Sequence, residues 1–185
     1  SNYTIDWGDK SPIENLSSFT TITHKYDSLG FFNLKITAFN LNSSCTFTRI
    51  YKVFNGNSPA GNLGSLGNDR DCVPFTFKWP VQNTLNNPPG TTYEFSVNDG
   101  SAPQLFDQTN LPDSISHTFT KSSCGFTDDQ FIVKFKVTNP CGTKSPTTQI
   151  QATQKPVASF STNPTTKFCA NNTITFTNTS VGNYI

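Results

Sequence analysis

Two segments of the chain show the strict alternation of apolar and polar residues that is typical of a half-buried β-strand. The first is GFFNLKITAFN, residues 30–40, and the second is QFIVKFKVTN, residues 130–139. A period of two with one mostly polar face predicts strands of an antiparallel sheet that covers a core on one side. No segment shows a competing helical period. The pattern therefore predicts an all-β protein.

Seven strands are expected in the middle of the chain, each bounded by turn residues. They cover residues 60–66, 75–79, 92–97, 104–106, 115–120, 130–139 and 147–152. The segments LPDS and NTLNNPPGTT carry Pro and Gly where strands cannot continue, so they are expected to be loops. About seven short strands in about 98 residues match the ~100 residues of an immunoglobulin-like β-sandwich.

The pattern also repeats. Asp9 and Asp99 each close a strand-like run that ends in a turn, GDKSP or NDGSAP. His24 and His117 each stand two residues before an aromatic side chain, in HKY and HTF. The two alternating strands follow, and both end at Asn. Self-similarity over such a length indicates a repeat architecture.

A third, incomplete copy follows. The segment PVASFSTNPTTKFCANNTITFTNTS resembles the earlier PAGNLGSLGNDRDCVPFTFKW. We expect residues 1–56 to be the C-terminal part of a first domain, 57–154 a complete domain and 155–185 the N-terminal part of a third. The expected fold class is thus all-β, with tandem immunoglobulin-like β-sandwiches that form a fragment of a longer repeat array.

Composition narrows the class of protein. With 13 basic and 12 acidic side chains the net charge is +1, which argues against a nucleic acid or an anionic membrane as partner. No apolar run approaches the ~18 residues that a membrane span requires. Five Cys and two His without zinc-site spacing favour disulfides, and disulfides favour an extracellular location.

The sequence predicts a protein that is not an enzyme and needs no cofactor. GxSxG, HExxH and glycine-rich phosphate loops do not occur. Because His24 and His117 occupy equivalent repeat positions, they are expected to tie a strand end or corner. Together with Asp9 and Asp99 they form an expected structural turn motif.

Two alternatives for polar and aromatic residues stay open. Asp6, Asp9 and Asp99 suggest calcium, but six to eight oxygen ligands are needed and each copy clusters only one or two carboxylates. Capping of their own turns is favoured, and no metal is expected. Trp7 and Trp79 are expected in the core. A sugar-stacking platform is the less favoured alternative. Phe31 and Phe39 are the outward-facing exceptions among the aromatics, unless an adjacent domain or an omitted strand covers them.

The motifs resemble those of a known family. IDWGDK, HKY and GFFNLKITAFN are similar to the signature of the polycystic kidney disease (PKD) domain, and VNDG, HTF and QFIVKFKVTN match it more loosely. The resemblance covers essentially the whole chain. It implies immunoglobulin-like sandwiches that occur in tandem on cell surfaces.

Tandem Thr- and Asn-rich copies with a Cys before the second strand and another after the Asn resemble the giant gliding-motility surface adhesins of Bacteroidota. The resemblance implies export by the type IX secretion system and an extracellular, outer-membrane-attached location. It also implies neighbouring repeats and the secretion and gliding machinery as partners, and a semi-rigid stalk that contacts an unknown surface or polysaccharide. PKD modules also accompany secreted hydrolases, so an accessory, polysaccharide-binding module is the alternative. A receptor that binds ligands through its loops also stays open.

The immunoglobulin-like topology indicates which cysteines lie close enough to form a disulfide. Strands alternate in direction, so Cys72 and Cys124 are expected at the same end of the sandwich, with Cys141 ~30 Å away at the other end. We predict a Cys72–Cys124 disulfide; Cys72–Cys141, which family spacing suggests, is the alternative. Cys45 and Cys169 are expected to have partners outside the segment.

Two triplets, DSL and DSI, resemble the O-glycosylation motif of Bacteroidota, with Ser28 and Ser114 as the acceptor residues.

Overall fold

The computed structural model describes residues 2–18, 20–40, 42–65, 67–163, 171 and 173–182. The expected all-β fold is confirmed, since the regular elements of these residues are strands and one short 3-10 turn, η1 (Thr127–Asp129). The strands are β1 (Asn2–Asp6), β2 (Glu14–Leu16), β3 (Gly30–Phe39), β4 (Thr46–Asn55), β5 (Asn62–Leu63), β6 (Arg70–Cys72), β7 (Phe75–Gln82), β8 (Thr92–Val97), β9 (Gln104–Asp107), β10 (Ser114–Phe119), β11 (Phe131–Asn139), β12 (Gly142–Lys144), β13 (Thr147–Thr153), β14 (Phe160–Asn163) and β15 (Thr175–Asn178).

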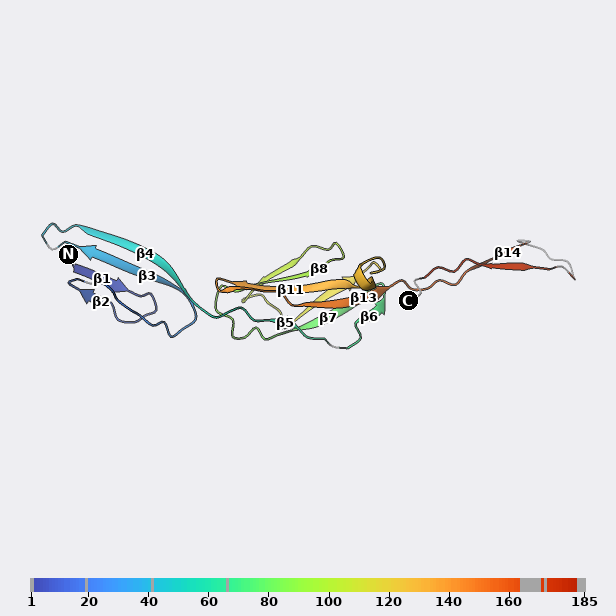
Figure 1. Cartoon of the computed structure of the whole chain (residues 1–185), viewed down its shortest axis with the longest axis horizontal. Coiled ribbons are helices and arrows are strands. Elements are labelled where there is room, and N and C mark those ends of the chain that lie inside the picture. Colours follow the sequence, from blue (N-terminus) through green and yellow to red (C-terminus); the bar gives the residue numbers. More distant parts are fainter. Residues whose placement is uncertain are drawn as a thin grey trace.

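The strands form three groups that follow one another along the longest axis of the molecule (Figure 1). We call them the N-terminal sheet (β1–β4), the central sandwich (β5–β13) and the C-terminal hairpin (β14–β15). The chain runs through them in sequence order, so each group is built from one continuous segment.

The N-terminal sheet is antiparallel, with the order β2-β1-β3-β4. Strands β3 and β4 pair over their full length, from Gly30 opposite Asn55 to Phe39 opposite Thr46. The most buried side chain is Ile5, on β1.

The central sandwich has two layers, and its core lies between them. One layer has the strand order β10-β7-β5 and the other has β6-β13-β11-β8-β9, with β12 paired to β11. The ring of Trp79 on β7 lies 5.4 Å from that of Phe95 on β8, which joins the layers. Both tryptophans are buried, so the expectation that Trp7 and Trp79 are core residues is confirmed. The fully buried core side chains are Trp79, Tyr93, Phe95, Ile115, Phe119, Phe131, Val133, Phe135, Val137, Ile150 and Ala152.

The expected strands are present, and the structure adds two. The expected strand at 60–66 is reduced to β5 (Asn62–Leu63), because the chain then crosses to the other layer, where β6 (Arg70–Cys72) pairs in parallel with β13. The other addition, β12 (Gly142–Lys144), closes a tight hairpin with β11. Every residue of β6 and β12 is exposed, so neither strand has an apolar face that would produce an alternating pattern.

The N-terminal sheet and the central sandwich share one pairing scheme. In the first, Ile5 of β1 lies opposite Ile36 of β3; in the second, Phe95 of β8 lies opposite Phe135 of β11. The next strands continue the match, with Phe32 opposite Val53 and Phe131 opposite Ile150. The sheets differ in burial, since β11 alternates fully buried with more exposed residues, whereas the equivalent positions of β3 are only half-buried.

The C-terminal hairpin consists of two antiparallel strands, with Phe160 opposite Asn178 and Asn163 opposite Thr175. A bridge between Val157 and Val181 extends it toward the central sandwich.

Candidate functional site

The structure brings the predicted turn residues together in two equivalent pairs. Nε2 of His24 lies 2.7 Å from Oδ2 of Asp9, and Nε2 of His117 lies 2.7 Å from Oδ2 of Asp99. The four side chains are 11–15% exposed. In the central sandwich, the pair joins the turn after β8 to β10, a strand of the facing layer. In the N-terminal sheet, the pair joins the turn after β1 to the segment between β2 and β3.

The second carboxylate oxygen of each aspartate holds its own turn. Oδ1 of Asp9 accepts hydrogen bonds from the backbone N–H of Ser11 at 3.0 Å and from its hydroxyl at 2.6 Å. Oδ1 of Asp99 accepts one from the Ser101 N–H at 2.9 Å. This is the turn-capping arrangement that the sequence favoured over a calcium site. The described residues hold no group of three or more His, Cys, Asp or Glu placed to bind a metal ion.

These contacts change the acidity of both aspartates. The hydroxyl of Ser11, followed by His24, lowers the pKa of Asp9 to about 2. Burial alone would raise the pKa of Asp99, but the hydrogen bonds from Ser101 and His117 outweigh it and lower that pKa. Both carboxylates are therefore charged at neutral pH, where they accept hydrogen bonds most strongly.

Aromatic rings complete the cluster around each histidine. In the N-terminal sheet, the His24 ring stacks on Trp7 at 4.4 Å and meets the edge of Tyr26 at 4.8 Å. In the central sandwich, the His117 ring packs edge-on against Phe119 at 4.8 Å. The Tyr26 hydroxyl donates to the Trp7 carbonyl, and burial, with the Asp9 charge as a lesser cause, raises the pKa of Tyr26.

The four described cysteines, Cys45, Cys72, Cys124 and Cys141, are free thiols in the structure. Sγ of Cys72 lies 3.4 Å from the Thr153 hydroxyl at the end of β13, and the residue before Cys124 donates its N–H to the neighbouring Ala152 carbonyl. These two cysteines thus flank the same end of β13. Cys141 follows β11 at the opposite end of the central sandwich, with its Sγ 3.5 Å from the Gly56 carbonyl. Cys169 lies outside the described residues.

The two serines of the glycosylation triplets differ in accessibility. Ser28 is exposed, in a loop that leads into β3, and its carbonyl accepts a hydrogen bond from Asn55. Ser114 is half-buried at the first position of β10. Ser28 is therefore the more accessible of the two predicted acceptor residues.

An open groove of about 510 Å³ lies along β8, β9 and β11. The ammonium of Lys136 donates to the carboxylate of Glu94 at 3.4 Å, and Leu105 is 71% exposed. The two aromatic residues that line the groove, Tyr93 and Phe106, contribute to the core, so neither ring forms an exposed platform. Carboxylate, ammonium and hydroxyl groups of this kind can hydrogen-bond a polar ligand.

Sequence reasoning missed a set of residues that join the N-terminal sheet to the central sandwich. Phe31 faces Gly90, where an added Cβ would lie 2.4 Å from its ring. The Phe31 ring also lies 4.8 Å from that of Phe54 and 4.6 Å from the ammonium of Lys52. The sequence placed Phe31 on the outward face, as a residue for sugar stacking or for cover by an adjacent domain or an omitted strand. Its partner Gly90 was not recognised, because no periodic pattern marks a contact between two groups of strands.

Polar contacts fasten the same junction. The Asn139 side chain donates to the Asn57 carbonyl at 3.0 Å. The buried Asn87 amide accepts from the Ala60 N–H at 2.8 Å and donates to the Ala60 carbonyl at 2.6 Å. The connection between β4 and β5 is therefore held to the central sandwich by its backbone.

Comparison with protein-family models and with curated proteins finds no match to this chain. Among the described residues, no helix has the length and apolar character needed to cross a membrane.

Proposed function

We propose that this chain is a stretch of a tandem array of immunoglobulin-like sandwiches that forms the semi-rigid stalk of an extracellular adhesin. Its role is mechanical and non-catalytic, since it holds a binding tip away from the cell and transmits force along the array. The PKD-like motifs suggest a gliding-motility adhesin exported by the type IX system, with the neighbouring repeats and the secretion and gliding machinery as its partners.

The observation that carries the proposal is the short, packed junction between consecutive groups of strands. β4 ends at Asn55 and β5 begins at Asn62, and within this connection Pro59 and Gly61 are buried. A connection of this kind has little of the conformational freedom of a flexible linker. The Phe31–Gly90 contact adds side-chain packing across the same joint. A joint that resists bending is what a stalk requires.

The repeated Asp–His clusters support the same role. Each ties a turn to an extended segment that faces it, and in the central sandwich this contact joins the two layers. Side chains that occur in equivalent places in two units serve the architecture that the units share. A binding or catalytic residue need occur only once.

The proposal is tested on cells of the source bacterium. Protease treatment of intact cells should remove an epitope within residues 57–154 while a periplasmic marker survives. Cells that lack the gene should attach less to glass and spread less. An in-frame deletion of residues 57–154 with the rest of the gene intact is the matched control, because a stalk shortened by one unit should keep most of its function. Retention of the protein inside the cell would contradict the proposal.

The groove along β8, β9 and β11 favours a second candidate, an accessory polysaccharide-binding module. Its charged and hydroxyl side chains offer hydrogen bonds to sugar hydroxyls. Affinity electrophoresis in gels cast with soluble polysaccharides tests this idea. Retardation that is lost in Lys136→Ala and kept in Lys78→Ala would support the module, and unchanged mobility in every polysaccharide would exclude it.

A further inference from the structure

The groove along β8, β9 and β11 has a row of three side chains across its middle. Leu105 of β9 lies opposite Glu94 of β8, and Glu94 lies opposite Lys136 of β11. Neighbouring strands are about 4.8 Å apart, so the three residues follow one another in a short line across the sheet. The residues before and after Glu94 and Lys136 belong to the buried core, so the row faces outward.

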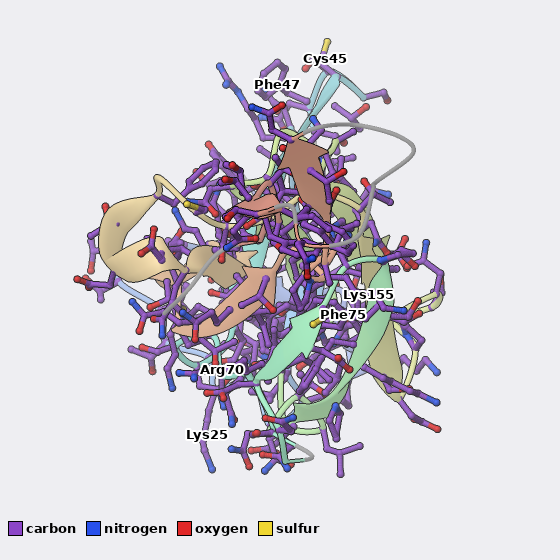
Figure 2. The ribbon with its side chains drawn as sticks, turned by 90° about the vertical axis from the view of Figure 1, so that its right-hand side faces the viewer. Lys25, Cys45, Phe47, Arg70, Phe75 and Lys155 are labelled. Carbon is purple, nitrogen blue, oxygen red and sulfur yellow. The ribbon has the colours of Figure 1, made fainter. Side chains whose placement is uncertain are left out.

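The charges of this row balance each other, and their side chains are half-buried. Nζ of Lys136 lies 3.4 Å from Oε2 of Glu94, and the two side chains are 40% and 34% exposed. The side chains of the ion pair between Lys25 and Asp27, in contrast, are 90% and 84% exposed. Figure 2 shows Lys25 reaching outward from the molecule. The groove thus holds a hydrogen-bond donor beside an acceptor, with no net charge between them.

A second carboxylate lies in the next row of the groove. Asp107 of β9 lies opposite Thr92 of β8. Oδ1 of Asp107 accepts hydrogen bonds from the N–H of Thr109 at 2.7 Å and from its hydroxyl at 2.6 Å. Within the described part of the chain no group donates to Oδ2 of Asp107, so this oxygen is left for a ligand.

The row of three side chains is absent from the equivalent place in the N-terminal sheet. There, Thr4 of β1 lies opposite Asn15 of β2 and Thr37 of β3. The pairing scheme is the same in both units, so the fold does not require a leucine, a carboxylate and an ammonium at these positions. Side chains that are peculiar to one unit point to a role of that unit alone.

We propose that this groove binds a neutral polysaccharide. A sugar hydroxyl both donates and accepts hydrogen bonds, so it is matched by acceptors such as Glu94 and Asp107 together with a donor such as Lys136. Leu105 is 71% exposed and supplies apolar contact to the C–H face of a sugar ring. The volume of about 510 Å³ lies within the ~300 to 1,000 Å³ of ligand pockets. This inference rests on the second candidate function and names the class of its ligand.

The same groups argue against other polymers. An anionic polysaccharide or a nucleic acid would bring its negative charges against two carboxylates, Glu94 and Asp107, with only the ammonium of Lys136 in the groove to offset them. A peptide that binds through its backbone needs a free strand edge. The groove lies instead on the face of the sheet, where β8 is paired on both sides.

The test is affinity electrophoresis of the 185-residue chain in native gels. The neutral probes are hydroxyethyl cellulose, dextran and galactomannan, the anionic probe is alginate, and the peptide probe is gelatin. The chain should be retarded by at least one neutral polysaccharide and by neither alginate nor gelatin. The retardation should persist at high salt, because screening weakens only contacts between charges.

The repeat supplies the variant that tests the row. Leu105→Asn, Glu94→Thr and Lys136→Thr together replace the row by the residues of the N-terminal sheet. The net charge stays at +1, since one basic and one acidic side chain are removed, so mobility in a gel without polysaccharide should not change. The triple variant should lose the retardation, and Leu105→Asn alone should weaken it. Lys134→Thr, an exposed lysine of the same strand outside the groove lining, is the control and should keep it.

Two results would overturn the proposal. One is retardation by alginate or gelatin alone, since the ligand would then belong to another class. The other is retardation by a neutral polysaccharide that survives in the triple variant, although far-UV circular dichroism shows that its strands are intact, because the binding must then use another surface. Retardation by alginate alone would leave the accessory module standing, whereas unchanged mobility in every gel would exclude both. Neither result affects the stalk, which is tested on cells.

Discussion

At the scale of single residues, the Asp–His pairs are the most informative contacts in the molecule. Each aspartate accepts hydrogen bonds from its own turn with one oxygen and contacts a histidine with the other. The recurrence of these residues was visible in the sequence, but their contact was not. The partners are 15 residues apart in one unit and 18 in the other, so no fixed local spacing reveals them.

The lowered pKa values of the aspartates predict loss of stability in acid. A carboxylate whose pKa is lower in the folded than in the unfolded chain stabilises the fold at pH values above its unfolded pKa of 3.8. This stabilisation is lost as the pH falls through the pKa of the folded state. For Asp9 the window runs from 3.8 to about 2. The melting temperature should fall steeply across this window, as followed by circular dichroism.

Asp99→Asn tests the same account in the central sandwich. It should cost about 1.5 to 3 kcal/mol near neutral pH, the usual range for a hydrogen bond to a charged group, and make stability less dependent on acid. Asp113→Asn, at an exposed aspartate, is the control. An acid limb of equal steepness in Asp99→Asn and the wild type would contradict the account.

A second residue-scale prediction concerns Lys10. It has φ of 72°, in the left-handed region, and the equivalent position in the central sandwich is Gly100, with φ of 92°. Lys10→Gly should stabilise the N-terminal sheet by about 0.5 to 1 kcal/mol, because the strain of a side chain outweighs the added freedom of glycine in the unfolded chain. Fluorescence of Trp7 in a Trp79→Phe background reports the unfolding; a loss of stability would refute the strain.

At the scale of elements, the sequence predicts the strands that have one buried face and misses those that have none. β8 (Thr92–Val97) lies where alternation placed it. β6 and β12 are wholly exposed, so only their hydrogen bonds to β13 and β11 define them. The partner of Phe31 at the junction was missed for the same reason, since Gly90 and Phe31 meet through tertiary contact and not through a local pattern.

The disulfide prediction also belongs to this scale. Cys72 and Cys124 flank the end of β13, whereas Cys141 lies beside Gly56 at the other end. A peptide map of the oxidised protein should recover Cys72 linked to Cys124. A link of this length should contribute on the order of 3 to 4 kcal/mol, so Cys72→Ser should destabilise the oxidised protein and Cys141→Ser should not. Recovery of Cys72 linked to Cys141 would support the alternative pairing.

At the scale of the whole molecule, stiffness should depend on the junction. Gly90→Ala places a Cβ against the Phe31 ring and should broaden the distribution of distances between spin labels in the N-terminal sheet and the central sandwich. Gly100→Ala is the control, because it imposes similar backbone strain at φ of 92° with nothing within 4 Å of the new Cβ. Equal broadening in both variants would show that the Phe31 contact does not stiffen the joint.

The central claim is that these strands form units joined end to end in a semi-rigid row. Small-angle X-ray scattering of the 185-residue chain, extrapolated to zero protein concentration, tests it most directly. The account predicts an asymmetric pair-distance distribution with a long tail that matches the extended arrangement of the three groups (Figure 1). A symmetric, bell-shaped distribution would mean that the groups fold against one another, and it would contradict the account.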